Sequence, residues 1–246
     1  MKYIFGNWKM YLDYKQSIEM AQSLVSKNLS KKDDLEIAVF PTALVMKEVI
    51  EILKSTNVKT GTQDAGHPSR GAYTGMISAE MYKDVGCVYA LAGHSERRHL
   101  FGETNKDVRV KIESYLDAGL KSVICIGETQ RDRDNDKTRY RLQKQIMRAF
   151  DGLNFGEGQI LVAYEPVWAI GTGNACLPVD AVDRINFIKS EIAKYSQNFV
   201  PVLYGGSVDE DNMLSYFSLD SIDGVLIGSA SAKISSFGNI IKSVLK

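Results

Sequence analysis

The chain has 246 residues, 44% hydrophobic and 24% charged, which is typical of a soluble globular protein with a large core. Lysine plus arginine balances aspartate plus glutamate at 30 each, so no overall charge favours nucleic acid or an anionic membrane as partner. The polar start and the lack of a long apolar run argue against a secreted or membrane protein. We expect the cysteines, Cys87, Cys125 and Cys176, to be buried thiols of a reducing compartment.

Short apolar runs predict eight β-strands, and they alternate with segments of helical character. The predicted strands are Tyr3–Gly6, Glu36–Phe40, Val58–Thr62, Val88–Ala92, Ser122–Ile126, Ile160–Tyr164, Val200–Leu203 and Gly224–Ile227. Strand and helix in strict alternation indicate parallel strands joined by right-handed crossovers. The runs are apolar rather than alternating, as expected for strands buried on both faces. Eight such units favour a closed barrel over an open doubly wound sheet.

Several intervening segments predict particular helices. They are expected over Val182–Ile192, Asp209–Phe217 and Phe237–Leu245, with a solvated helix start in Arg131–Arg141. Pro178 and Asp180 precede the first of these, and Asp180 is its expected N-terminal cap. Because no linker or low-complexity segment interrupts the pattern, we predict a single domain over residues 1–246.

The decapeptide Tyr164–Gly173, Tyr-Glu-Pro-Val-Trp-Ala-Ile-Gly-Thr-Gly, is the most informative segment for function. Glu165 directly follows a buried strand, where a poorly solvated carboxylate is a stronger base. Pro166 and the glycines at 171 and 173 bracket a segment that is suited to close over that base as a lid.

Further polar residues and glycines follow the other predicted strands. They are Asn7, Lys9, Gln63, His94, Glu96, Gly205-Gly206-Ser207 and Gly228-Ser229. In a barrel the carboxyl ends of the strands converge on one face, where active sites of this fold are built. The two glycine-containing loops follow the seventh and eighth strands and present backbone N–H groups, which predicts a phosphate site.

Five segments resemble, in order, signatures of the triosephosphate isomerase family: Gly6–Met10, Gly93–Arg98, Cys125–Glu128, Tyr164–Gly173 and Tyr204–Val208. The resemblance covers essentially the whole chain and implies a closed eight-stranded parallel (β/α)8 TIM barrel. It implies a cytoplasmic isomerase that interconverts dihydroxyacetone phosphate and D-glyceraldehyde 3-phosphate through an enediol(ate), in glycolysis and gluconeogenesis. No cofactor is implied, because proton transfer needs none. No metal is implied either, because the histidines show no ligand spacing.

The resemblance also assigns roles to individual residues. Glu165 is the base that removes a proton from C1, and His94 polarises the carbonyl as a neutral imidazole. Lys9 supplies positive charge and Asn7 an orienting hydrogen bond, both in contact with substrate, while Glu96 supports these groups rather than acting as a base. The phosphate ligands are Gly171, Ser207, Gly228 and Ser229. The lid that excludes water comprises Pro166, Val167, Trp168, Ala169, Ile170, Gly171, Thr172 and Gly173.

The sequence departs from the family pattern at four positions: Tyr11 for asparagine, Met76 for an acid, Asn174 for lysine and Ser229 for glycine. Met76 follows the long Gln63–Gly75 loop, which in the family interlocks with a second subunit. A loop of this length is usually functional, and we therefore expect a homodimer.

Two other functions are compatible with parts of the pattern. An aldolase-type lyase would use Lys9 as a Schiff-base amine, but imine formation needs a desolvated amine and we expect Lys9 to be exposed. A non-catalytic phosphate-binding protein would need only the glycine-containing loops. The presence of Glu165, His94 and Lys9 together favours an enzyme.

Overall fold

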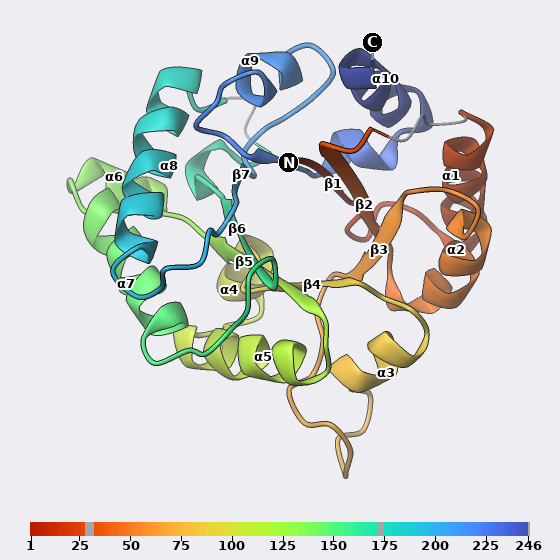
Figure 1. Cartoon of the computed structure of the whole chain (residues 1–246), viewed down its shortest axis with the longest axis horizontal. Coiled ribbons are helices and arrows are strands. Elements are labelled where there is room, and N and C mark those ends of the chain that lie inside the picture. The colour runs from red at the N-terminus through yellow and green to blue at the C-terminus, as the bar shows by residue number, and fades with distance from the viewer. Residues whose placement is uncertain (28–31, 172–174, 246) are drawn as a thin grey trace.

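The computed structural model describes residues 1–27, 32–171 and 175–245. Its strands form a closed barrel in sequence order, and every neighbouring pair is parallel (Figure 1). The strands are β1 (Lys2–Asn7), β2 (Leu35–Phe40), β3 (Lys59–Thr62), β4 (Tyr89–Ala92), β5 (Lys121–Ile126), β6 (Ile160–Tyr164), β7 (Val202–Tyr204) and β8 (Gly224–Ile227). The predicted closed (β/α)8 barrel is therefore confirmed.

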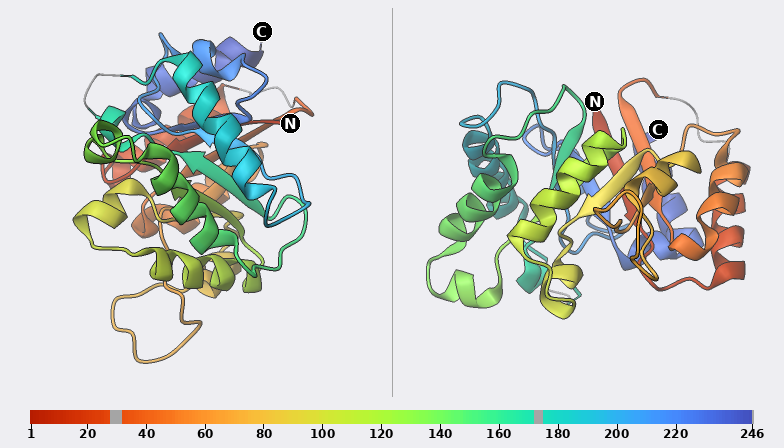
Figure 2. Two further views of the ribbon diagram at one scale, coloured as in Figure 1. Left: turned by 90° about the vertical axis from the view of Figure 1, so that its left-hand side faces the viewer. Right: turned by 90° about the horizontal axis from the view of Figure 1, so that it is seen from below.

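Helices surround the barrel on the outside (Figure 1). They are α1 (Tyr14–Ser26), α2 (Met46–Leu53), α3 (Ala79–Asp84), α4 (Ser95–Leu100), α5 (Asn105–Asp117), α6 (Gln130–Asp134), α7 (Thr138–Phe150), α8 (Pro178–Ile192), α9 (Met213–Phe217) and α10 (Ile234–Leu245). Short 3-10 turns lie at η1 (Ala43–Val45), η2 (Val167–Ala169) and η3 (Ser229–Ala232). The loop between β3 and α3 projects from the body of the barrel (Figure 2).

Most strands are largely apolar because each one faces two cores, and β3 (Lys-Thr-Gly-Thr) is the exception. One core fills the barrel, where Phe5, Phe40 and Tyr89 pack together, and the other lies between the barrel and its helices. Gly61 on β3 leaves room for this packing, since a Cβ there would lie 2.3 Å from a ring carbon of Phe40. The three cysteines are buried free thiols, as predicted.

The sixth and eighth strands have the predicted boundaries, and each of the other strands differs from the prediction by one or two residues at one or both ends. The seventh strand begins at Val202 rather than Val200, because Pro201 has no N–H to donate to a neighbouring strand. Asn7 is the last residue of β1 rather than the first residue after it, and it pairs in register with Phe40.

Three helix predictions also need correction. The helix expected from Asp209 begins at Met213, because the Asp209 side chain accepts hydrogen bonds from two backbone N–H groups in a turn of its own. The Arg131–Arg141 stretch spans the end of α6 and the start of α7, separated by a turn in which Asp136 has a φ of 54°. Asp180 lies in the first turn of α8, which begins at Pro178, and is not its cap.

Candidate active site

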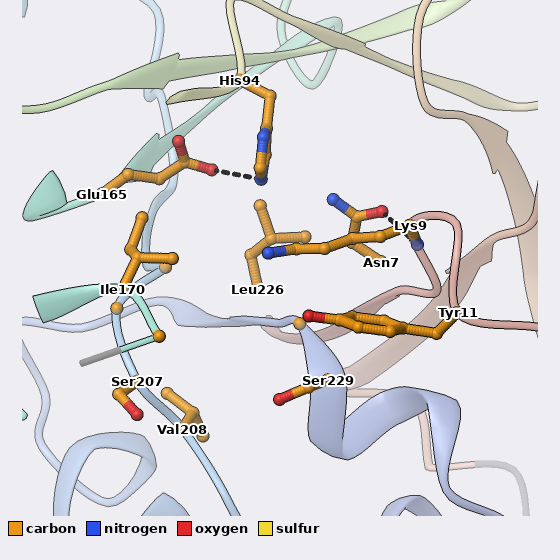
Figure 3. Close-up of a pocket in the computed structure, with 14 residues that line it drawn as sticks. Asn7, Lys9, Tyr11, His94, Glu165, Ile170, Ser207, Val208, Leu226 and Ser229 are labelled. Carbon is orange, nitrogen blue, oxygen red and sulfur yellow. Dashed lines mark hydrogen bonds and ion pairs between the residues drawn. The ribbon is translucent and has the colours of Figure 1, made fainter. Parts of the chain in front are cut away.

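The carboxyl ends of five strands converge on one cavity (Figure 3). Its described lining residues are Asn7, Lys9, Tyr11, His94, Glu165, Ile170, Gly171, Gly205, Gly206, Ser207, Val208, Leu226, Gly228 and Ser229. The cavity therefore combines a carboxylate, an imidazole and an ammonium group with two glycine-containing loops.

A tightly held turn after β1 directs Lys9 into the cavity. Lys9 has a φ of 50°, a left-handed conformation that costs on the order of 1 kcal/mol or more in a residue with a side chain. The Asn7 side chain stabilises this turn by accepting a hydrogen bond from the Lys9 N–H at 3.0 Å. Gln63 adds a second contact, donating from Nε2 to the Lys9 carbonyl at 2.7 Å. The turn thus fixes the direction in which the lysine leaves the backbone.

The Lys9 ammonium forms an ion pair with Glu96, with Nζ 2.7 Å from Oε1. The Lys9 side chain is only 14% exposed, so the expectation of an exposed lysine is wrong. The Lys9 ammonium is therefore held against a carboxylate rather than lying free in solvent. An amine engaged in an ion pair is less available to attack a carbonyl carbon, as imine formation would require.

His94 is the N-terminal cap of α4. Its Nδ1 accepts a hydrogen bond from the Glu96 N–H at 3.3 Å, so Nδ1 carries no proton in this arrangement. The proton of a neutral imidazole is then on Nε2, which faces the cavity (Figure 3). The helix terminus therefore selects the tautomer that donates a hydrogen bond to a ligand.

Glu165 is 2% exposed and lies directly beside His94. Its Oε2 accepts a hydrogen bond from the Ser95 N–H at 2.8 Å, and its Oε1 lies 3.2 Å from His94 Nε2 (Figure 3). Burial and the neighbouring Glu165 carboxylate both raise the pKa of the Cys125 thiol well above its usual range. This thiol therefore stays neutral and adds no charge beside the carboxylate.

The opposite end of the cavity is formed by the loops after β7 and β8. In the part of the chain that the structure describes, no acceptor takes the backbone N–H of Ser207 or of Ser229. Gly228 lies beneath Lys9, since a Cβ there would be 3.2 Å from Lys9 Cε. Unpaired N–H groups beside an ammonium group make this end suitable for an anion.

Hydrogen bonds to Glu128 hold the first part of the segment that follows Glu165. The Trp168 indole donates to Glu128 Oε1 at 2.8 Å, and the Arg133 guanidinium lies 4.0 Å from the Trp168 ring. Burial raises the pKa of Glu128, and the hydrogen bonds from Trp168 and Tyr164 oppose this rise. Farther along, Ile170 and Gly171 line the cavity. This segment thus has one anchored end and one end at the cavity.

The structure brings most of the predicted site residues together. Asn7, Lys9, His94, Glu165, Gly171, Ser207, Gly228 and Ser229 line the cavity, and Glu96 contacts it through Lys9. Residues 166–169 lie outside the cavity wall. Thr172, Gly173 and the departure Asn174 lie outside the described residues.

Other contributions to the site did not emerge from the sequence. The Ser95 N–H acts through the backbone, so residue type gives no signal for it. Gly127 packs against Glu165, where a Cβ would lie 1.7 Å from the Glu165 carbonyl oxygen. Gln63 is among the polar residues that follow predicted strands, but the sequence assigned it no role in holding the Lys9 turn. Glu128 also lies shortly after a predicted strand, and that position is the signal from which its role could have been found.

Residues 1–27, 32–171 and 175–245 contain no cluster of three or more histidine, cysteine, aspartate or glutamate side chains arranged to hold a metal ion. No helix among them combines the length and the apolar character needed to span a bilayer.

A barrel with a carboxylate, an imidazole and an anion site at the strand ends defines an enzyme of small phosphorylated substrates. The sequence model of the triosephosphate isomerase family matches residues 2–244. The chain is 39% identical to triosephosphate isomerases of Dehalococcoides mccartyi (strain CBDB1), covering 97% of this chain and 94% of the relative, and Geotalea uraniireducens, covering 97% of each. It is also 39% identical to that of Francisella philomiragia, covering 100% of this chain and 98% of the relative.

The chain therefore belongs to the triosephosphate isomerase family. It is an isomerase that interconverts dihydroxyacetone phosphate and D-glyceraldehyde 3-phosphate, a step of glycolysis.

Proposed function

We propose that Glu165 is the base of this isomerisation and that His94 and Lys9 stabilise the negative charge that develops on the substrate. The observation that carries the proposal is the facing pair of Glu165 Oε1 and His94 Nε2, 3.2 Å apart inside the cavity. A substrate entering here displaces that contact and places its reacting carbons beside the carboxylate and its oxygens beside the imidazole.

The proposed proton transfers balance. Glu165 takes a proton from C1 of dihydroxyacetone phosphate, and the electron pair moves to the C2 carbonyl oxygen to give an enediolate. His94 gives its Nε2 proton to that oxygen and takes the proton of the C1 hydroxyl. Glu165 then returns a proton to C2, which yields D-glyceraldehyde 3-phosphate. Because both groups end as they began, the cycle needs no other reactant.

Lys9 and the two loops hold the rest of the substrate in this scheme. The Lys9 ammonium lies between the Glu165–His94 end and the Gly228–Ser229 loop, so its charge acts on both the oxyanion and the phosphate. Gly171, Ser207, Gly228 and Ser229 are the proposed phosphate ligands. Asn7 fixes the turn that carries Lys9, and Glu96 holds the ammonium in place.

A coupled isomerase assay on the purified protein, in both directions, tests the assignment. Borohydride added with substrate separates it from the lyase alternative, because only an imine at Lys9 would be trapped as a covalent adduct. Activity without an adduct supports the proposal, and an adduct or a lack of activity overturns it.

We also propose that residues 166–173 close over the bound substrate and exclude water. Deletion of residues 170–173 is expected to leave the barrel folded, because Ile170 and Gly171 contribute to the cavity rather than to the core. The exposed enediolate should then lose phosphate, and methylglyoxal should appear alongside product. Slow isomerisation without methylglyoxal would contradict the water-excluding role.

The proposed assembly is a homodimer of single-domain barrels in the cytoplasm. Met10, Leu100 and Phe101 are 92%, 73% and 69% exposed and line a groove beside Lys9 and His94. The projecting Gln63–Gly75 loop carries Tyr73, which is 50% exposed, and leads to the equally exposed Met76 (Figure 2). An exposed apolar groove and an exposed loop with apolar side chains can cover each other in a two-fold pair.

Phe101→Glu is expected to weaken this dimer by at least about 100-fold, because it places a charge in an apolar contact. Sedimentation equilibrium measures the dissociation constant. Val179→Glu is the matched control, since Val179 is 70% exposed on α8 and lies outside the groove. A wild-type chain that sediments as a monomer at every concentration would exclude the dimer.

A further inference from the structure

We propose that Tyr11 is a further substrate-binding residue whose phenolic hydroxyl donates a hydrogen bond to the phosphate of the triose phosphate. This inference rests on the proposed function, because it assigns a ligand to the phosphate end of the same cavity. Tyr11 stands where the family pattern has asparagine, so the role concerns this chain in particular.

The turn that directs Lys9 into the cavity also directs Tyr11 there. The Tyr11 N–H donates to the Trp8 carbonyl at 3.2 Å, closing the turn around Lys9 and Met10. Met10 is 92% exposed, whereas Lys9 and Tyr11 on either side of it line the cavity. The turn that holds the catalytic lysine therefore also sets where the tyrosine leaves the backbone.

The charges in the cavity show why a neutral donor is useful at this point. Among the lining residues that the structure describes, Lys9 is the only cation, and Glu165 is an anion. A phosphate monoester carries close to two negative charges at neutral pH, and its three terminal oxygens accept many hydrogen bonds. One lysine can donate to only some of these acceptor sites, so backbone N–H groups and hydroxyls must supply the other hydrogen bonds. A phenol is a suitable donor for a charged oxygen.

The Tyr11 hydroxyl points to the same end of the cavity as the Ser207 and Ser229 side chains (Figure 3). None of these three hydroxyls has a hydrogen-bond partner within the described part of the chain. Tyr11 and Ser229 both line the cavity, and both are departures from the family pattern. The geometry thus directs two non-family hydroxyls to the end of the cavity that is proposed to hold the phosphate.

Tyr11→Phe removes the hydroxyl and keeps the ring. Since Tyr11 is 57% exposed, the variant should fold as the wild type does. We expect it to bind 2-phosphoglycolate about tenfold more weakly, which corresponds to ~1.4 kcal/mol. It should lower kcat/KM for D-glyceraldehyde 3-phosphate by a similar factor and leave kcat/KM for phosphate-free D-glyceraldehyde unchanged, because the lost contact is remote from the reacting carbons.

Tyr14→Phe is the matched control, because Tyr14 is a similarly exposed tyrosine three residues farther on, outside the cavity. Ser229→Gly tests the neighbouring departure, and we expect it to change 2-phosphoglycolate affinity by less than about tenfold. Wild-type affinity in Tyr11→Phe would overturn the inference, and so would equal losses for the phosphorylated and phosphate-free substrates. Failure of the proposed function can be told apart from failure of this inference. If the wild-type protein had no isomerase activity, titration with 2-phosphoglycolate would still test whether Tyr11 binds phosphate.

Discussion

Glu165→Asp is expected to lower kcat by about 100-fold or more while the protein remains folded. The substitution keeps the negative charge but withdraws the carboxylate by one methylene. The backbone has little freedom to follow, because the Glu165 N–H donates to the Ile126 carbonyl at 2.7 Å and the Glu165 carbonyl packs against Gly127. The carboxylate should therefore be misplaced by about 1 Å relative to C1 and C2, and misplacement on that scale accounts for the loss.

Steady-state kinetics in both directions measure the loss of kcat. Titration with 2-phosphoglycolate shows whether ligand affinity has changed as well. The affinity should change far less than kcat, since the inhibitor phosphate binds at the other end of the cavity. Gln is the complementary substitution, because Glu165→Gln keeps the reach and removes the basic oxygen. It should lower kcat still further. Near-wild-type kcat in Glu165→Asp would show that another group is the base.

The architecture was predictable because its causes are local and repeated. Buried strands leave apolar runs, crossovers leave helical periodicity between them, and eight such units close a barrel. The first and last residues of the helices and strands were harder to predict, because they depend on single local contacts. The Asp209 side chain competes with the helix that would otherwise begin there, and Pro201 delays the start of β7.

The sequence predicted which residues meet at the site, because the topology of the barrel determines their place. Lys9, His94 and Glu165 each follow a strand, and parallel strands bring their carboxyl ends to one face. Their orientations were not predictable, because backbone groups set them. The Ser95 N–H holds the Glu165 carboxylate, and the Glu96 N–H selects the His94 tautomer. The burial of Lys9 against Glu96 was not predictable either, because a side-chain contact across 87 residues leaves no local pattern.

His94→Asn separates the two functions of that imidazole. Nδ1 caps α4 by accepting from the Glu96 N–H, and Nε2 faces the cavity. Asparagine is among the strongest N-terminal caps, so its side-chain oxygen can replace Nδ1 in the helix. It is too short to place a donor where Nε2 lies. The unfolding free energy should therefore change by less than about 1 kcal/mol.

The catalytic effect of His94→Asn should be large, because the developing oxyanion loses a donor at a site where His94 is only 6% exposed. Removal of one such donor typically costs about 10²–10³-fold in kcat. Urea unfolding and steady-state kinetics on one preparation give both quantities, and His94→Ala is the control that loses the cap as well as the donor. A His94→Asn variant with kcat within about tenfold of wild type would remove His94 from the proposed mechanism. If His94→Asn instead lost as much stability as His94→Ala, the activity loss would reflect the helix terminus, and the imidazole would act by positioning α4 and the Ser95 N–H that holds Glu165.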